Sequence, residues 1–123
     1  MDKRHVRRTK IVQNLYAWSF ADDFSSMPDP EDERTKQIIE HLVEIDELIN
    51  RHSEKFSTDK IAKTDLSILR LGVYELTVEK KLPPKVVIDE AVELAKELGG
   101  EKSYAFVNAV LGKVLQDVEP NHE

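Results

Sequence analysis

The residue types that most often carry catalysis or bind metals are sparse and poorly spaced in this sequence. Cysteine is absent from all 123 residues, which excludes disulfides, thiolate metal sites and thiol catalysis. Two histidines on one helix face need a spacing of three or four residues. None of the four histidines meets it; they are His5, His41, His52 and His122. The sequence therefore predicts no metal site.

Other catalytic patterns are missing as well. No nucleophile and base pair or cofactor-binding loop is visible, and the pair Gly99-Gly100 lacks both the G-x-G-x-x-G and the Walker pattern. Carboxylates cluster between residues 30 and 51, but they fall on the outer face of an amphipathic helix, as solvated charges usually do. We therefore expect neither an enzyme nor a bound cofactor.

Charge is the strongest chemical signal, and it is concentrated at the N-terminus. Residues 1–10 hold five lysines and arginines against one aspartate, a formal charge of +4, whereas the remaining residues carry −10. A basic arm on an acidic body fits contact with a polyanion such as nucleic acid. A solubilising, partly disordered terminus is the alternative.

Helical periodicity organises the rest of the chain. Apolar residues recur at intervals of three and four, and no stretch alternates as a strand would, so the fold class is all-α with six or seven helices in one domain, 1–123. The linker 21–32 and the connection 52–63 separate the longer helices, and the tail 117–123 should fray. The main expected helices are 6–20, 30–51, 64–78, 84–98 and 102–116.

The helix from Thr64 to Leu76 should be the packing axis, because its apolar residues fall on more than one stripe. Thr64 is expected to cap it, Pro84 to begin the next helix, and Gly99-Gly100 to end that helix. Tyr16 and Trp18 are expected to pack inward as core or half-buried anchors. With no membrane span and no signal-peptide pattern, a cytoplasmic protein is expected.

Four stretches, in order, resemble the NusB family of bacterial transcription antitermination factors. Together they cover most of the chain outside residues 18–62, and their combination is more specific than any single piece. They are RRTKIVQNLY (7–16), KTDLSILRLGVYEL (63–76), LPPKVVIDEAVELAKELGG (82–100) and SYAFVNAVLGKVL (103–115).

This resemblance implies two packed three-helix subdomains and a binding protein that is not an enzyme. The implied partners are a boxA-type single-stranded RNA, the ribosomal protein NusE and the RNA polymerase antitermination complex, supporting transcription of ribosomal RNA operons. A homodimer is left open. The alternative function is a protein-interaction module that keeps the NusB scaffold without specific RNA binding.

The resemblance also implies site residues. Phosphate contacts are expected from Lys3, Arg4, Arg7 and Arg8; four such contacts predict a salt slope near −3, at about 0.7 for each phosphate of a single strand. Further RNA-binding candidates are Gln13, Lys96, Lys102, Tyr104 and Phe106, of which Phe106 is equally well read as core. The NusE-facing candidates are Tyr16, Asp65 and Glu75. The sequence departs from the family pattern at Lys102, Ala109 and Gly112.

Overall fold

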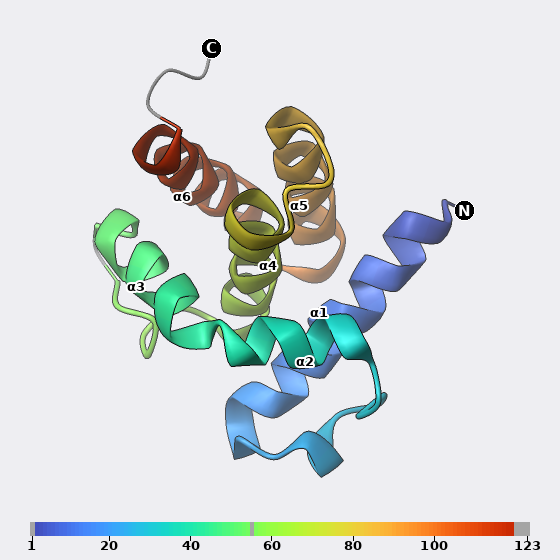
Figure 1. The fold of residues 1–123 in the computed structure, drawn as a ribbon. Helices are drawn as coiled ribbons and strands as arrows, with labels where there is room; N and C mark the ends of the chain where they lie inside the picture. The colour runs from blue at the N-terminus through green and yellow to red at the C-terminus, as the bar shows by residue number, and fades with distance from the viewer. Residues whose placement is uncertain (1, 55, 120–123) are drawn as a thin grey trace.

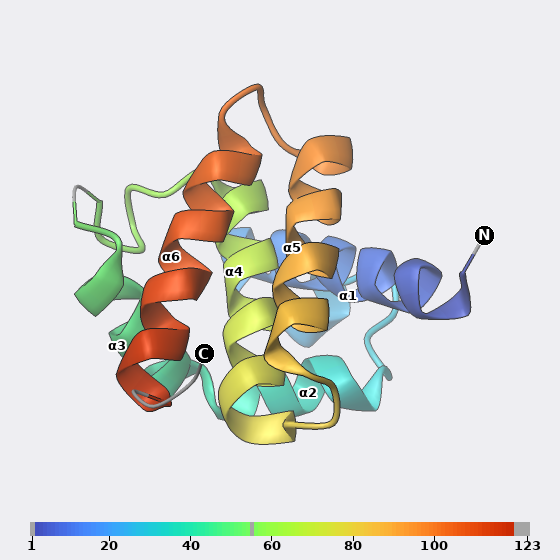
Figure 2. The ribbon, with the colours of Figure 1, turned by 90° about the horizontal axis from the view of Figure 1, so that it is seen from above.

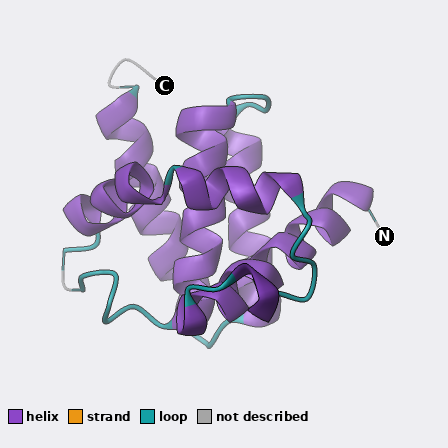
Figure 3. Ribbon diagram, turned by 60° about the horizontal axis from the view of Figure 1, so that its bottom comes forward, coloured by secondary structure: helices purple, strands orange, loops and turns teal. Residues whose placement is uncertain are grey.

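Six α-helices make up the fold in this computed structural model, which describes residues 2–54 and 56–119 (Figures 1 and 3). A 3₁₀ turn, η1 (Phe24–Ser26), follows the first helix, and a π-helical turn, η2 (Glu75–Glu79), continues the fourth. Within the described residues there is no strand, which confirms the all-α prediction. The helices are α1 (Lys3–Ala21), α2 (Glu33–Glu40), α3 (Leu42–His52), α4 (Lys63–Tyr74), α5 (Pro84–Leu98) and α6 (Ser103–Val118).

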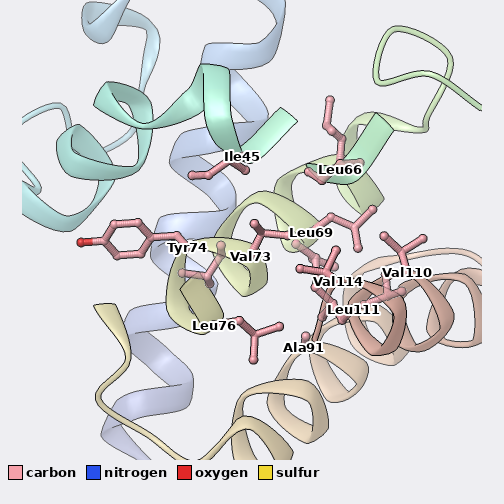
Figure 4. Packing of buried hydrophobic residues seen from close by; sticks show 14 of the residues in the cluster. Ile45, Leu66, Leu69, Val73, Tyr74, Leu76, Ala91, Val110, Leu111 and Val114 are labelled. Atoms are coloured by element: carbon pink, nitrogen blue, oxygen red, sulfur yellow. The ribbon is translucent and has the colours of Figure 1, made fainter. Parts of the chain in front are cut away.

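The helix α4 is the packing axis, as its apolar pattern predicted. Every residue from Leu66 to Tyr74 is buried, and α4 contacts α1, α3, α5 and α6 (Figure 2). Figure 4 shows side chains of α3, α5 and α6 meeting around Leu69 and Val73. At Gly72 a Cβ atom would lie 2.9 Å from Leu111 Cδ1, so the missing side chain allows the close approach of α6. The helices α4–α6 pack together against α1–α3, which agrees with two three-helix subdomains.

The basic arm is helical. The helix α1 begins at Lys3, three residues before the predicted start, because the Asp2 carboxylate accepts a hydrogen bond of 2.9 Å from the Arg4 N–H and caps the helix. The alternative of a disordered terminus is therefore wrong for residues 2–10, and the arm has a defined orientation on the fold.

The helix predicted over 30–51 is two helices. The side chain of Asp32 accepts a hydrogen bond of 2.8 Å from the Thr35 N–H, which sets the start of α2, and the chain leaves helical geometry at His41. This break lets α2 pack on α1 while α3 packs on α4 (Figure 1). The periodicity of apolar residues correctly predicted that Ile38 and Ile45 are buried. It could not predict the change in chain direction between α2 and α3, because the apolar stripe continues across the break.

Helix ends agree with the predictions in part. Pro84 begins α5 and Gly99 caps it, but Thr64 does not cap α4, because that helix already begins at Lys63 after Ala62. Residues 117 and 118 of the predicted tail form the last turn of α6. The rest of the predicted tail, 120–123 with His122, lies outside the described residues. The helices described here are all too short or too polar to cross a membrane.

Candidate nucleic-acid and partner interfaces

Arginines of α1 line a polar hollow of about 270 Å³ that we call the arginine pocket. Arg4, Arg7 and Arg8 recur at three- and four-residue intervals, so they share one face of α1. The opposite wall comes from α2, from η2 and from the turn that follows η2. The pocket is lined by Arg4, Arg7, Arg8, Arg34, Glu75, Glu79, Lys81 and Leu82.

The back of the arginine pocket is a buried ion pair. Arg8 and Glu75 are each 3% exposed, and Arg8 donates three hydrogen bonds of 2.8–3.2 Å to the Glu75 carboxylate. Burial alone would lower the pKa of Arg8, but the hydrogen bonds and negative charge of Glu75 raise it above its ordinary value, so the guanidinium stays charged. Arg8 and Glu75, predicted for RNA and NusE contacts, are therefore paired with each other inside the protein.

A second arginine extends this network to α2. Arg34 donates two hydrogen bonds of 3.0 and 3.1 Å to Glu79 and a longer one of 3.4 Å to Glu75. The network of two arginines and two glutamates thereby joins α1, α2 and η2. Residues 18–62 matched no family motif, so the sequence offered no signal that Arg34 belongs to the site.

The other side of α1 forms a separate hollow of about 290 Å³, lined by His5, Val6, Thr9, Lys10, Gln13 and Glu97. The His5 ring lies 2.8 Å from Glu97 and 3.7 Å from Glu90, which fastens the first turns of α1 to α5. The hydrogen bond to Glu97 raises the pKa of His5 above its ordinary value. Gln13 is exposed at this hollow.

The remaining predicted RNA residues gather around the start of α6. The Lys96 ammonium lies 5.5 Å from the centre of the Tyr104 ring, and Lys102 and Tyr104 are exposed. Phe106 is partly buried, packs against the core and meets Phe56 edge to face at 6.3 Å. This placement agrees with the interpretation of Phe106 as a core residue. The exposed arm residues Lys3, Arg4 and Arg7 thus form one group of predicted RNA residues and this patch at α6 forms another, whereas Arg8 is buried and Gln13 lies at the hollow beside His5.

An apolar groove of about 350 Å³ runs beside the middle of α1 and is lined by Val12, Gln13, Tyr16, Ala17, Pro28, Thr64 and Leu98. Tyr16 is 43% exposed, so the expectation that it packs inward is wrong, whereas Trp18 is half-buried as expected. Phe20 is 64% exposed and stacks edge to face on Tyr16 at 5.0 Å. Because residues four apart share a helix face, the spacing of Tyr16 and Phe20 could have identified Phe20 as part of the same surface as Tyr16.

Asp65 follows Thr64, which lines the apolar groove, but Asp65 itself is not among the groove residues. The side chain of Asp65 is half-buried at the start of α4, and its Oδ1 atom is buried without a hydrogen-bond partner among the described residues. Tyr16, predicted to face a partner protein, is exposed at the groove, whereas Asp65, predicted for the same role, lies next to a groove residue with its Oδ1 atom buried. Glu75 lies elsewhere, in the buried network.

The structure shows the surroundings of the three residues that depart from the family pattern, Lys102, Ala109 and Gly112. Lys102 is exposed and forms no ion pair within the described part of the chain. Ala109 and Gly112 line a groove of about 570 Å³ beside α3, and a Cβ atom at Gly112 would meet no atom within 4 Å. Nowhere in residues 2–54 and 56–119 do three acidic, histidine or cysteine side chains gather as they would around a metal ion.

Comparison with known proteins gives one consistent family. The NusB family model matches residues 5–116. A transcription antitermination protein NusB of Myxococcus xanthus is 43% identical over 134 aligned positions, covering 93% of this chain and 95% of the relative. The NusB of Agathobacter rectalis is 52% identical over 82 positions, which cover 67% of this chain and 63% of the length of that relative.

The fold of a solved structure agrees with this match. A chain in a crystal structure of the antitermination factors NusB and NusE in complex with double-stranded RNA superposes with a TM-score of 0.77 at 26% identity. The superposition covers 94% of this chain and 99% of that chain.

Proposed function

Because the chain belongs to the NusB family, we propose that it is a transcription antitermination factor that binds boxA-type single-stranded RNA together with a NusE-type ribosomal protein. A solved structure of similar fold holds NusB, NusE and RNA in one complex. One observation on this chain carries the proposal: α1 presents exposed cations at its start and the apolar groove near its middle. A single helix can therefore hold the RNA next to the partner.

Roles within the RNA site follow from exposure and charge. Lys3, Arg4 and Arg7 are exposed and neutralise phosphates, whereas the buried Arg8 holds α1 in place. Around α6, Lys96 and Lys102 supply further positive charge, and Tyr104 offers a ring on which an unpaired base can stack. The side chain of Gln13 lies between these contacts and the partner groove.

The partner site is the apolar groove. Tyr16 and Leu98 expose apolar surface there, and the exposed Phe20 ring stacks on Tyr16; aromatic anchors of this kind dominate protein interfaces. Asp65, whose buried Oδ1 atom has no partner among the described residues, offers a carboxylate to a basic group of NusE. The bound pair would then act within the RNA polymerase antitermination complex.

Fluorescence anisotropy with a boxA RNA, measured with and without NusE at several salt concentrations, tests the proposal. We expect sequence-dependent binding that NusE strengthens. With three exposed arm contacts at about 0.7 each, the arm should contribute about −2 to the salt slope. Binding without sequence preference and without a gain from NusE would refute the function. NusE binding in the absence of RNA binding would instead indicate the protein-interaction module.

A further inference from the structure

The arginine pocket contains two basic residues that the RNA site described above does not use, Arg34 of α2 and Lys81 after η2. We propose that this pocket holds one phosphate group of the bound RNA strand, with Lys81 and Arg34 closing over it from the side opposite Arg4 and Arg7. The inference rests on the proposed function, because it names the RNA backbone as the ligand. It adds a phosphate site between α1, α2 and the turn after η2.

The charge balance of the pocket favours an anion. Five lining residues are positive and two are negative, so the lining has a formal net charge of +3. Both carboxylates are already engaged: Glu75 pairs with Arg8 at 2.8 Å and Glu79 with Arg34 at 3.0 Å. The excess positive charge therefore belongs to the arm and to Lys81.

Those outer cations lack strong partners of their own. Arg7 and Lys81 form no ion pair within residues 2–54 and 56–119. Arg4 has only a 3.8 Å contact with Asp2, in which both side chains are about half exposed. An exposed pair of this kind contributes little energy, so Arg4 can turn to a phosphate at little cost.

The back wall holds an unused donor. The Nη1 atom of Arg8 is buried, makes no hydrogen bond to any described residue, and lies 4.0 Å from the nearest oxygen of Glu90. A buried donor without a partner is costly, so an oxygen atom is needed near it. Because Nη1 is buried, a phosphate in the pocket can supply that atom only through a bridging water.

The shape and lining of the pocket select a phosphate over a base. Leu82 is the only apolar lining residue, and no aromatic ring is present on which a base could stack. The volume of about 270 Å³ leaves room for a phosphate group and its hydration.

The turn after η2 brings Lys81 to this pocket. The π-helical turn is capped by Lys80, whose φ of 52° is left-handed and uncommon for a residue with a side chain. Both π-helical turns and left-handed non-glycine residues are enriched at functional sites. The reversal at Lys80 places the exposed side chain of Lys81 at the rim, opposite the arm.

Charge removal at Lys81 tests the proposal directly. The full chain with NusE is titrated with boxA RNA at several salt concentrations, comparing Lys81→Gln with Lys60→Gln, an exposed lysine outside the pocket lining. Lys81→Gln should weaken binding about fivefold and flatten the salt slope by about 0.7, whereas Lys60→Gln should change neither. If the two variants behave alike, the pocket does not hold a phosphate.

A modified RNA locates the contact. Each phosphate is replaced in turn by an uncharged methylphosphonate, and the affinities of the wild type and of Lys81→Gln are compared. At one position the substitution should weaken the wild type and abolish the difference between the two proteins. An equal effect of Lys81→Gln at every position would mean diffuse attraction and would overturn the assignment.

Arg34→Gln tests the second contact, with Arg51→Gln as its matched control, since Arg51 also pairs with two carboxylates. Because Arg34→Gln frees Glu79, Arg34→Lys is measured beside it and should recover part of the affinity. A loss of NusE binding with an unchanged RNA salt slope would assign the pocket to acidic groups of the partner protein instead.

Failure of the proposed function gives a different result. If the wild type binds no RNA with or without NusE, the function is refuted, and amide chemical shifts are then followed during titration with inorganic phosphate. Shifts confined to the pocket residues would keep an anion site and reject RNA as its source. An absence of shifts there would reject the site as well.

Discussion

Replacement of Glu75 by glutamine should be among the most destabilising polar changes in this protein. The substitution keeps the size of the side chain and removes its charge, which leaves the Arg8 guanidinium, 3% exposed, without the carboxylate that accepts its three hydrogen bonds. Removing one partner of a buried pair typically costs about 3–5 kcal/mol. Glu90, 4.0 Å from Arg8, can compensate in part, so we expect about 3 kcal/mol.

Urea unfolding followed by circular dichroism measures this cost. The control is Asp89→Asn, which breaks the exposed pair of Lys85 and Asp89 on α5, whose side chains are 85% and 63% exposed; its cost should stay below about 0.5 kcal/mol. The double variant Arg8→Met with Glu75→Leu should recover most of the loss, because two apolar side chains can replace a buried pair at little cost.

Two results would contradict this account. A cost below about 1 kcal/mol for Glu75→Gln would mean that the Arg8 charge does not depend on Glu75. A double variant that is no more stable than Glu75→Gln would mean that the cost comes from packing and not from an unpaired charge.

Three further predictions concern other parts of the fold. Titration of His5 followed by NMR should give a pKa above 6.5 in the wild type and a pKa closer to 6.5 in Glu97→Gln. The stability that the contact of His5 with α5 contributes is therefore complete below pH 6.5 and is lost as the pH rises through the raised pKa. An unchanged His5 pKa in Glu97→Gln would exclude the contact. Gly112→Ala should stabilise α6 by about 0.5–1 kcal/mol in urea unfolding, because its Cβ atom enters open space, and a destabilised variant would contradict that placement. Asp65→Asn should weaken NusE binding in a pull-down with little loss of stability, whereas Leu69→Ala should cost about 2–5 kcal/mol; the reverse pattern would argue against the partner role of Asp65.

Much of the fold could be predicted because helices are local. Apolar residues spaced three and four apart identified α4 as the axis, and Pro84 and Gly99 marked the ends of α5. The sequence pattern did not predict the break at His41, because the apolar stripes of α2 and α3 follow each other in register like those of one helix. The change of direction between α2 and α3 is set by their contacts with α1 and α4.

The candidate site was predicted less completely. Exposed cations at the start of α1 could be identified from charge, but the division between Arg7, which is exposed, and Arg8, which is buried, depends on the docking of α1. Arg34 and Lys81 gave no signal, since an isolated basic residue is usually a solvated one. Arg70 donates two hydrogen bonds to Asp46, 24 residues away, and no local pattern in the sequence indicates this pairing.

The helical class, the central helix, the charge asymmetry and the family likeness could all be predicted from the sequence, since each depends on neighbouring residues or on the order of motifs. Which charges face the solvent and which face each other depends on how the helices pack. Arg8 and Glu75 are 67 residues apart, and nothing in the local pattern of either residue reports the other. Their pairing exists because packing brings α1 against η2, and the same packing creates the arginine pocket above them.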